Sequence, residues 1–246
     1  MLVSVIIPTY NRYTLLQRAI RSLLEQTHQV AEVIVVDDGS TDNTAQIQKD
    51  FPYIRYIYQE NSGVAAARNR GIELAQHKWI AFLDSDDEWH SEKLERQVLL
   101  HRNNPDILFS YTAELWLRNN TQVKIPKKYK KIGQNIFVEN LSYCNIAPSS
   151  VLLHRSILER VGFFDDSFRV CEDYELWLRI LSVYEAGLIN EPLIHKHAGH
   201  DLQLGFSKNM ETLRIRALEK LLHKPLSKTY RALVQKELEE KLARQK

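Results

Sequence analysis

Hydrophobic residues in the first part of the chain alternate between short apolar runs and stretches with helical spacing. The run Val3–Ile7 is rich in β-branched residues and stops at Pro8, and apolar residues then recur at helical spacing as far as Leu24. The same alternation predicts strands at Val33–Val36, Ile54–Tyr58 and Trp79–Leu83 and a helix at Val64–Ala75. Strands that alternate with helices are typical of a mostly parallel sheet covered on both faces, so the pattern predicts an α/β fold.

Three of the predicted strands end in polar clusters. In chain order these read Pro8-Thr9-Tyr10-Asn11, Asp37-Asp38-Gly39-Ser40 and Asp84-Ser85-Asp86-Asp87. Because parallel sheets bind their ligands at the carboxyl ends of the strands, we expect the clusters to converge on one crevice. Thr41 or Asp42 suits the cap of the helix that follows the second cluster.

The regular alternation weakens after about residue 105. Residues 107–117 and Val151–Leu153 are apolar enough for strands, and Tyr174–Leu181 has the spacing of a helix. Residues 122–133 contain Lys124, Lys127, Lys128, Lys130 and Lys131, which suit either a solvated loop or contact with an anionic acceptor or lipid surface. From Ser207 onwards the pattern is helical, and 11 Lys or Arg against 5 Glu give this segment a charge of +6.

Composition places the chain among soluble globular proteins. Hydrophobic residues make up 44% and charged residues 26% of it, which argues against a disordered chain. The formal net charge of +2 provides no field that would draw the protein onto nucleic acid, so no nucleic-acid partner is expected. No apolar stretch approaches the about 18 residues of a membrane span, and no basic segment precedes an apolar core, so neither a span nor a secretory signal is expected. Cys144 and Cys171 lack metal or redox spacing, which indicates reduced cysteines and a cytoplasmic location.

Asp84 and Asp86 form a pair of carboxylates at the end of a predicted buried strand. Two like charges in a partly dry crevice are costly unless a cation joins them, and carboxylate oxygens suit Mg²⁺ or Mn²⁺. The alternative is an ordinary acidic loop in which Asp86 or Asp87 caps the next helix.

Two other polar positions allow both a structural and a functional interpretation. Asp38 suits a turn with a helix cap, but its carboxylate could also accept the ring N–H of a uracil or a ribose hydroxyl. Arg68 follows the small residues Gly63–Ala67 and suits either a plain surface position or a pyrophosphate partner near the crevice.

Four motifs follow one another along the chain, namely Val3–Arg12, Val35–Ser40, Gly63–Asn69 and Phe82–Asp87. Their order and spacing resemble the nucleotide-sugar half of family-two glycosyltransferases. The resemblance continues through Pro148–Val151, Val161–Asp165 and Glu172-Asp173 to the region of His200, and so covers about residues 1–205. It implies the single-domain α/β fold called GT-A for residues 1–206, with a nucleotide-sugar half at 1–105, an acceptor half at 106–206 and a helical, basic extension at 207–246.

The resemblance also implies roles for individual residues. Thr9 and Tyr10 would hold the nucleobase, Asp38 would pair with it, Arg68 would lie near the phosphates and Asp84 would meet the ribose, with Pro8, Arg12 and Ser85 in the same donor site. Asp86 would ligate a Mn²⁺ or Mg²⁺ ion on the pyrophosphate.

Glu172 and Asp173 open a predicted helix, where acidic residues simply suit the helix dipole. The resemblance gives Asp173 the role of general base, which takes the proton from the acceptor hydroxyl. His195, His197 and His200 lie close together but complete no zinc pattern. By resemblance His200, with Leu204 four residues later, becomes a third metal or pyrophosphate contact, although Gly205 departs from the usual Ser; His197 is the alternative.

The resemblance implies an inverting, metal-dependent enzyme. It would move one sugar from a nucleoside-diphosphate sugar, with UDP as the expected nucleotide, to a hydroxyl of a glycan or lipid-linked acceptor. The Gln-x-x-Arg-Trp motif of processive synthases is absent, which favours a single transfer. The lysine-rich stretch and the basic tail would suit peripheral attachment to the inner membrane face.

Two alternatives from other classes stay open. One is a non-catalytic nucleotide-sugar-binding protein of the same fold. The other is a phosphohydrolase of the haloacid dehalogenase type, with Asp84 as nucleophile and Asp86 as general acid. That pattern has Thr or Val where this chain has Glu88 and places its motif on the first strand.

Overall fold

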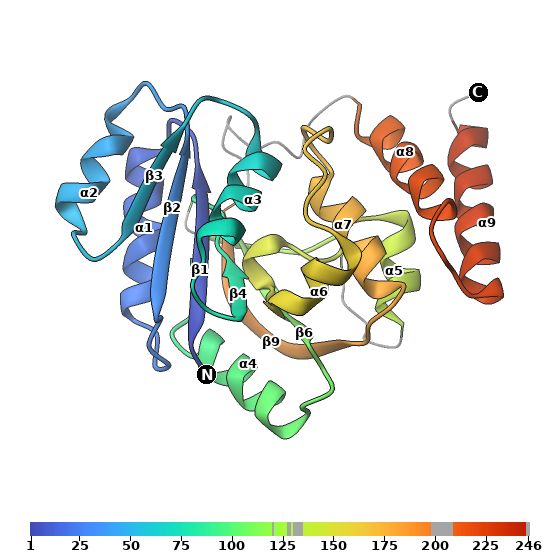
Figure 1. The fold of residues 1–246 in the computed structure, drawn as a ribbon, viewed down its shortest axis with the longest axis horizontal. Helices are drawn as coiled ribbons and strands as arrows, with labels where there is room; N and C mark the ends of the chain where they lie inside the picture. The colour runs from blue at the N-terminus through green and yellow to red at the C-terminus, as the bar shows by residue number, and fades with distance from the viewer. Residues whose placement is uncertain (120, 127–128, 130–134, 198–208, 245–246) are drawn as a thin grey trace.

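A single sheet with helices on both faces organises the computed structural model, which describes residues 1–119, 121–126, 129, 135–197 and 209–244 (Figure 1). The strands follow the order β3-β2-β1-β4-β8-β6-β9-β5, and β7 pairs with β6. Their bounds are β1 Val3–Thr9, β2 Glu32–Asp38, β3 Arg55–Gln59, β4 Trp79–Phe82, β5 Asp87–Trp89, β6 Phe109–Arg118, β7 Thr121–Val123, β8 Leu152–His154 and β9 Ala186–His197. The helices are α1 Tyr13–Leu24, α2 Ile47–Asp50, α3 Val64–Leu74, α4 Lys93–Asn103, α5 Ile136–Ser142, α6 Arg155–Val161, α7 Glu172–Leu181, α8 Met210–Leu222 and α9 Lys228–Arg244.

The first four strands form a parallel half of the sheet. β1 pairs in parallel with β2 and β4, and β2 pairs in parallel with β3. Every residue of β1 is buried, as expected for a strand covered by helices on both faces. Asp42 caps the short 3₁₀ helix after β2 by accepting a hydrogen bond from the Thr44 backbone N–H at 2.9 Å. The predicted alternation of strands and helices and the α/β class are confirmed.

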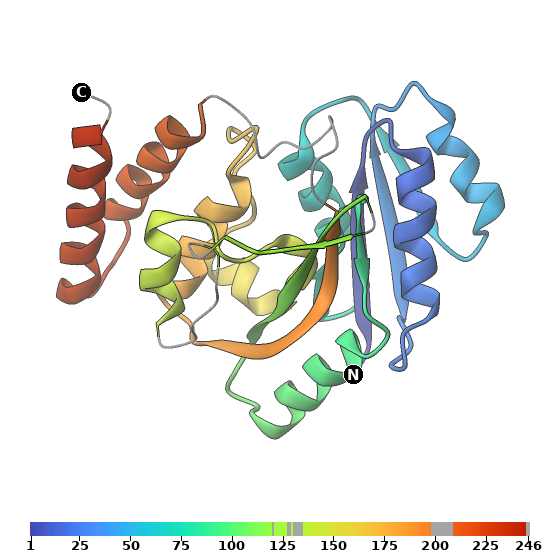
Figure 2. The same ribbon diagram turned by 180° about the vertical axis from the view of Figure 1, so that it is seen from behind.

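The remaining strands make the sheet mixed. β8 runs antiparallel to β4 and β6, and β5 runs antiparallel to β9. β9 lies parallel to β6 across the middle of the molecule (Figure 2). Neither β5 nor β9 is predicted by the sequence pattern. Asp87 starts β5 and the next helix starts at Lys93, so the interpretation of Asp87 as the cap of that helix is wrong.

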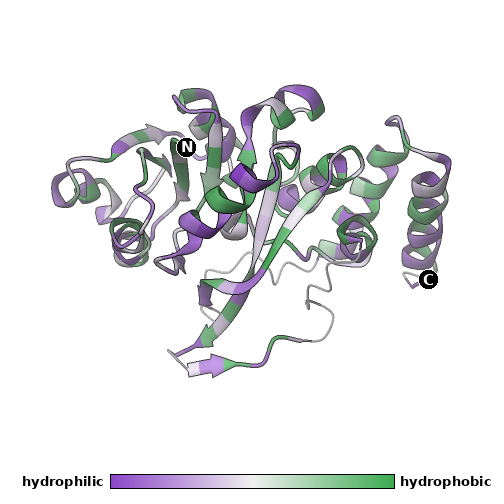
Figure 3. Ribbon diagram, turned by 90° about the horizontal axis from the view of Figure 1, so that it is seen from below, coloured by the Kyte–Doolittle hydropathy of each residue, from purple (hydrophilic) through white to green (hydrophobic). Residues whose placement is uncertain are grey.

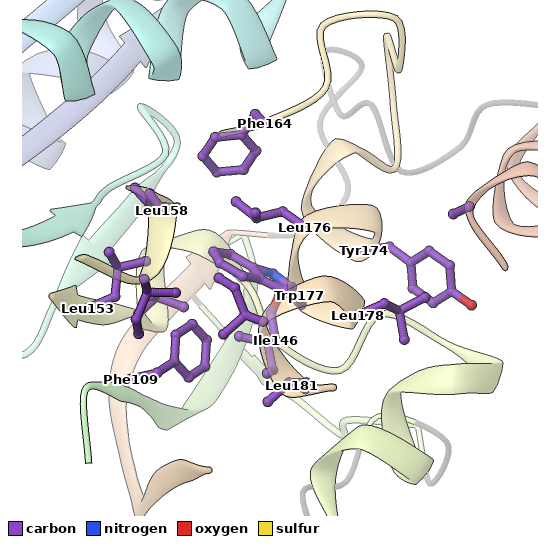
Figure 4. Close-up of a cluster of buried hydrophobic side chains, with 14 of the residues drawn as sticks. Phe109, Ile146, Leu153, Leu158, Phe164, Tyr174, Leu176, Trp177, Leu178 and Leu181 are labelled. Carbon is purple, nitrogen blue, oxygen red and sulfur yellow. The ribbon is translucent and has the colours of Figure 1, made fainter. Parts of the chain in front are cut away.

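The largest hydrophobic cluster lies between the mixed half of the sheet and the helices α5, α6 and α7. It contains Phe109 of β6, Leu153 of β8 and Trp177 of α7 (Figure 4). The C-terminal helices share this cluster through buried residues of α8 and α9, among them Leu218 and Val234. Hydrophobic residues are prominent on the central strands, whereas α9 is largely hydrophilic (Figure 3). The expected helical C-terminal end is therefore present and packs on α5 and α7.

A buried lysine fixes the last helix to its neighbours. Lys241 of α9 is only 1% exposed, and its ammonium donates to the Ser142 carbonyl at 3.1 Å and to Glu211 Oε1 at 2.9 Å. Glu237 lies 3.4 Å from the same ammonium. The carboxylates of Glu211 in α8 and Glu237 in α9 therefore offset the cost of burying this ammonium. Within the described residues, no helix combines the length and the apolar character that crossing a membrane requires.

A close approach between α3 and β1 provides a test of this packing. A Cβ added to Gly71 would lie 2.3 Å from Ile6 Cγ2. In a helix interior, alanine is normally more favourable than glycine by about 0.8–1 kcal/mol. Overpacking by the added methyl group, however, costs about 1–3 kcal/mol. We therefore expect Gly71→Ala to lower the free energy of unfolding by about 1 kcal/mol or more in urea titrations followed by circular dichroism. The exposed control Glu73→Ala should stay within about 0.5 kcal/mol of the parent. A Gly71→Ala protein more stable than the parent would contradict the close approach.

Candidate active site

A cavity of about 830 Å³ lies where the parallel strands β1 and β4 end. Its walls also include the start of α7, parts of β6 and β9, and the first turns of α8. The predicted site residues that line it are Pro8, Arg12, Arg68, Asp84, Ser85, Asp86 and Asp173. Members of the clusters after β1 and β4 therefore line one cavity, whereas no residue of the cluster Asp37–Ser40 after β2 does, so the expected convergence of all three clusters is met only in part.

Arg68 joins the two sides of this cavity. Its side chain is almost fully buried, and it donates to Asp84 Oδ1 at 2.7 Å and to Glu172 Oε1 at 2.6 Å. The guanidinium carbon also lies 5.3 Å from the centre of the Phe164 ring, which belongs to the core cluster (Figure 4). Burial alone would lower the pKa of Arg68, but the two carboxylates outweigh it and raise that pKa. The interpretation of Arg68 as a surface residue is wrong, and a contact with phosphate stays a prediction.

The charged form of Glu172 is stabilised by its contact with Arg68. Burial raises the pKa of Glu172, Arg68 opposes that shift, and the neighbouring charge of Asp173 adds to it. Because a buried carboxylate without a partner is costly, the guanidinium of Arg68 stabilises the charged form where α7 begins. Arg68 thereby ties the start of α7 to the end of β4.

The carboxylates of the acidic loop after β4 contact different partners. Asp86 Oδ2 lies 3.3 Å from Arg12 Nη1, and the Asp86 carbonyl accepts a hydrogen bond from Arg18 at 2.8 Å. Asp87 is buried and accepts a hydrogen bond from Ser149 Oγ at 2.6 Å. Burial raises the pKa of Asp87, and Lys196 opposes that shift. The three carboxyl groups of the loop therefore have three different environments, and only that of Asp87 is fully buried.

Lys196 is a cavity residue that the motifs do not reveal. It lies opposite Asp87 in the pairing of β5 with β9, and it lines the cavity beside the acidic loop. Burial alone would lower the pKa of Lys196, but Asp87, Glu114, Asp84 and Asp86 together raise it. No local sequence signal marks this lysine, because its position depends on the long-range pairing of β9.

Asp173 lies in the first turn of α7 and lines the cavity. Its Oδ1 accepts a hydrogen bond from the Tyr174 backbone N–H at 2.7 Å. A carboxylate in this position is stabilised by the helix dipole. Asp173 and the acidic loop therefore face one cavity although they lie far apart in the sequence.

Three residues predicted to bind the donor do not line the cavity. Tyr10 is 47% exposed, whereas Thr9 is buried and its hydroxyl has no hydrogen-bond partner among the described residues. Both carboxylate oxygens of Asp38 accept bonds from the segment before α3, at 2.9 Å from Ser62 N and 2.8 Å from Gly63 N. Gly63 has a φ of 94°, a conformation that glycine adopts without strain. Asp38 thus stabilises this turn, and its contact with a nucleobase stays a prediction.

Of the two candidate histidines, His200 lies outside the described residues. His197 is described, and its Nε2 lies 2.5 Å from Glu88 Oε1. In the part of the chain that the structure describes, no three His, Cys, Asp or Glu side chains are grouped as a metal site. A metal ion here would therefore need ligands from the nucleotide or from other residues in addition to Asp84 and Asp86.

The rest of the cavity wall includes several residues that sequence reasoning missed, and also Lys124 of the lysine-rich stretch, for which a solvated loop and an anionic contact are the two expected alternatives. Trp116, Arg118 and Lys124 come from β6 and the segment around β7, and Met210 and Arg214 come from α8. The two free cysteines, Cys144 and Cys171, also line this wall. Because α8 lies beyond the motifs, only the packing of the C-terminal helices could reveal its contribution.

The Glycosyl transferase family 2 model matches residues 4–162 of the chain. An uncharacterised glycosyltransferase of Rickettsia felis is 37% identical over 202 residues, which cover 78% of this chain and 32% of that protein. The UDP-Glc:alpha-D-GlcNAc-diphosphoundecaprenol beta-1,3-glucosyltransferase WfgD of Escherichia coli is 37% identical over 192 residues, which cover 77% of this chain and 73% of that protein. The chain thus spans about a third of the length of the Rickettsia felis relative.

Solved structures share the fold. S. aureus TarS 1–349 in complex with UDP-GlcNAc gives a TM-score of 0.78 at 19% sequence identity, covering 99% of this chain and 72% of that one. The mannosyltransferase PcManGT from Pyrobaculum calidifontis, in complex with GDP-Man and Mn²⁺, gives a TM-score of 0.71 at 17% identity, covering 98% and 74%. These similarities confirm the expected GT-A fold.

The Arg68 contacts generate a stability prediction. Removing one partner of a buried charge pair costs about 3–5 kcal/mol, because the other charge stays buried. We expect Arg68→Met to lower the free energy of unfolding by about that amount in urea titrations. The control Arg70→Met, at an exposed position of the same helix, should change it by less than about 0.5 kcal/mol. If Arg68→Met were no more destabilising than Arg70→Met, the bridge would not hold the cavity together.

Proposed function

Since the chain belongs to Glycosyl transferase family 2, we propose that its cavity transfers one sugar from a nucleoside-diphosphate sugar to a hydroxyl group of an acceptor. The observation that carries the proposal is that the acidic pair Asp84 and Asp86 and the carboxylate of Asp173 line the same cavity. A donor held by the acidic loop would then place its anomeric carbon within reach of an acceptor beside Asp173. The rival phosphohydrolase needs Asp84 as a nucleophile, but Arg68 binds that carboxylate, which follows the fourth strand.

The donor we propose is a UDP-sugar and the acceptor a lipid-linked sugar diphosphate. Two Escherichia coli relatives, WfgD and WfaP, are named for the transfer of glucose from UDP-Glc to GlcNAc-diphosphoundecaprenol. The cavity volume of about 830 Å³ is of the size that small-molecule sites have. An acceptor in the membrane would bring the protein to the cytoplasmic face as a peripheral protein, to which its basic residues could contribute.

A divalent cation fits the chemistry of the acidic loop. Asp84 and Asp86 supply hard oxygen ligands, and both line the cavity. We propose that Asp86 holds Mn²⁺ or Mg²⁺ together with oxygens of the donor. When bound, the cation would neutralise charge on the leaving diphosphate. Arg12 and Lys196 would add positive charge from the chain itself.

The transfer is proposed to be a direct displacement with inversion. The acceptor oxygen attacks the anomeric carbon, the bond from that carbon to the diphosphate oxygen breaks, and the acceptor proton passes to Asp173. Glu172 is bound to Arg68 and is not free for this task, whereas Asp173 faces the cavity. The two neighbouring carboxylates therefore have different roles. Glu172 positions the start of α7, and Asp173 accepts the proton.

The metal proposal predicts a loss of cation-dependent binding. UDP should bind the parent protein at least about tenfold more tightly with Mn²⁺ than with EDTA, a difference of about 1.4 kcal/mol. Asp86→Ala should remove that difference in calorimetric titrations, whereas Asp106→Ala, at an exposed position outside the cavity, should preserve it. Equal UDP affinity with and without the cation in the parent protein would contradict the proposal.

The base proposal predicts a loss of turnover without a loss of binding. Asp173→Asn keeps the shape of the side chain and removes the proton acceptor, so transfer should fall by roughly 10² to 10⁴. UDP affinity, measured calorimetrically with Mn²⁺, should stay within about twofold of the parent. A folded Asp173→Asn protein that transfers sugar at nearly the parent rate would assign the proton to another group. A parent protein that binds UDP-sugar but transfers nothing to any lipid-linked acceptor would favour the non-catalytic alternative.

A further inference from the structure

Two groups of charged residues line the cavity. Asp84, Asp86 and Asp87 lie at the strand ends beside the cations Arg12, Arg68 and Lys196. Arg118, Lys124 and Arg214 come from β6, the segment after β7 and α8, and Glu114 of β6 lines the cavity as well. The apolar and aromatic residues Trp116, Val123, Pro126, Tyr129, Ile146 and Met210 also line the cavity. A neutral sugar chain alone would require no group of three cations such as Arg118, Lys124 and Arg214.

Arg214 is the most firmly placed of the three cations. Its side chain is 12% exposed and lies 3.3 Å from Glu211, and its guanidinium carbon lies 5.5 Å from the centre of the Tyr143 ring. Glu211 also binds the buried Lys241 at 2.9 Å, so the position of Arg214 depends indirectly on α9. The C-terminal helices thus fix a guanidinium at the wall of the cavity.

Two donors on this wall have no hydrogen-bond acceptor in the part of the chain that the structure describes. Arg214 Nε and Trp116 Nε1 are buried without hydrogen-bond partners among the described residues. Buried donors of this kind are costly unless something accepts from them. Trp116 and Tyr143 are linked through Tyr129, whose ring centre lies 5.6 Å from that of Trp116 and 6.1 Å from that of Tyr143. The aromatic row therefore extends from the indole to the ring beside Arg214.

We propose that Trp116, Arg118, Lys124 and Arg214 form a subsite for the diphosphate of a prenyl-linked acceptor, with Lys241 as a positioning residue. This inference rests on the proposed function, since it assigns the acceptor class to the cavity that receives the donor. Arginine provides several N–H donors that match phosphate oxygens, and the apolar side chains of the wall suit the first units of a prenyl chain. The donor diphosphate would lie at the strand ends beside the acidic loop, where a divalent cation offsets the repulsion.

Direct binding tests this subsite without any turnover. The probes are farnesyl diphosphate, farnesol and UDP with Mn²⁺, titrated calorimetrically into the full chain. We expect the parent to bind farnesyl diphosphate at least about tenfold more tightly than farnesol. Arg214→Met should weaken farnesyl diphosphate by about 10- to 100-fold, the range for losing a hydrogen bond to a charged group, and leave UDP within about twofold.

Matched variants separate recognition from folding. Arg216→Met, two residues away at an exposed position bound to Ser167, should leave all three affinities unchanged. Arg118→Met, at an exposed position that cannot disturb the core, should weaken farnesyl diphosphate by about 3- to 10-fold if Arg214→Met does not fold. Lys241→Met should weaken the binding of farnesyl diphosphate, because Glu211 loses this partner and Arg214 is displaced. Lys241→Arg, which keeps a cation at this position, should retain part of that affinity.

Several results would overturn the subsite. One is equal affinity of the parent protein for farnesyl diphosphate and farnesol. Another is unchanged binding of farnesyl diphosphate by folded Arg214→Met and Arg118→Met proteins. A third is a loss of UDP affinity in these variants that matches their loss of farnesyl diphosphate affinity. The last result would assign the cations to the donor. A parent that binds farnesyl diphosphate as expected but shows no transfer from any UDP-sugar would instead count against the proposed function and leave the subsite supported.

Discussion

The guanidinium of Arg68 is the contact on which the geometry of the cavity depends. It is buried between Asp84, at the end of β4, and Glu172, at the start of α7. Each carboxylate belongs to a segment that also carries a residue with a proposed chemical task, Asp86 in one case and Asp173 in the other. Because Arg68 and Glu172 are buried and Asp84 is partly buried, removing one of these charges leaves a buried partner uncompensated. Arg68 thereby links the end of β4 to the start of α7.

Much of the fold follows from local sequence patterns, but part of it does not. β1 and β2 are almost wholly buried, so their apolar runs stand out against the polar clusters that follow them. β9 shows no such run, because it holds Glu191 and Pro192 and ends in alternating His and Lys. Its register with β6 shifts around Ala113, opposite Pro192, and proline is tolerated at such irregularities in a sheet. β9 is thus a strand because of its partner, and no local rule reveals it.

Some residues of the site can likewise be predicted from local motifs, whereas others depend on long-range packing. Asp84, Asp86 and Asp173 occupy short motifs at element ends, where their spacing alone suggests chemistry, and the structure brings them to one cavity. Lys196 and Arg214 require the pairing of β9 and the docking of α8. Asp38 shows the opposite case, because its carboxylate satisfies two backbone N–H groups of the turn before α3. A motif therefore identifies a residue as important, but its contacts determine whether it acts on a ligand or on the chain.

A crystal structure of the full chain grown with UDP and Mn²⁺ would test the central claim most directly, namely that one cavity holds the donor diphosphate against the acidic loop and faces Asp173. The account predicts density for the cation beside Asp86 and for the diphosphate within the cavity lined by Pro8, Arg12 and Asp84. It also predicts that the Arg68 contacts to Asp84 and Glu172 persist. A nucleotide bound elsewhere, for example in the hollow lined by Gln59, Asn69 and Asp166, would contradict it.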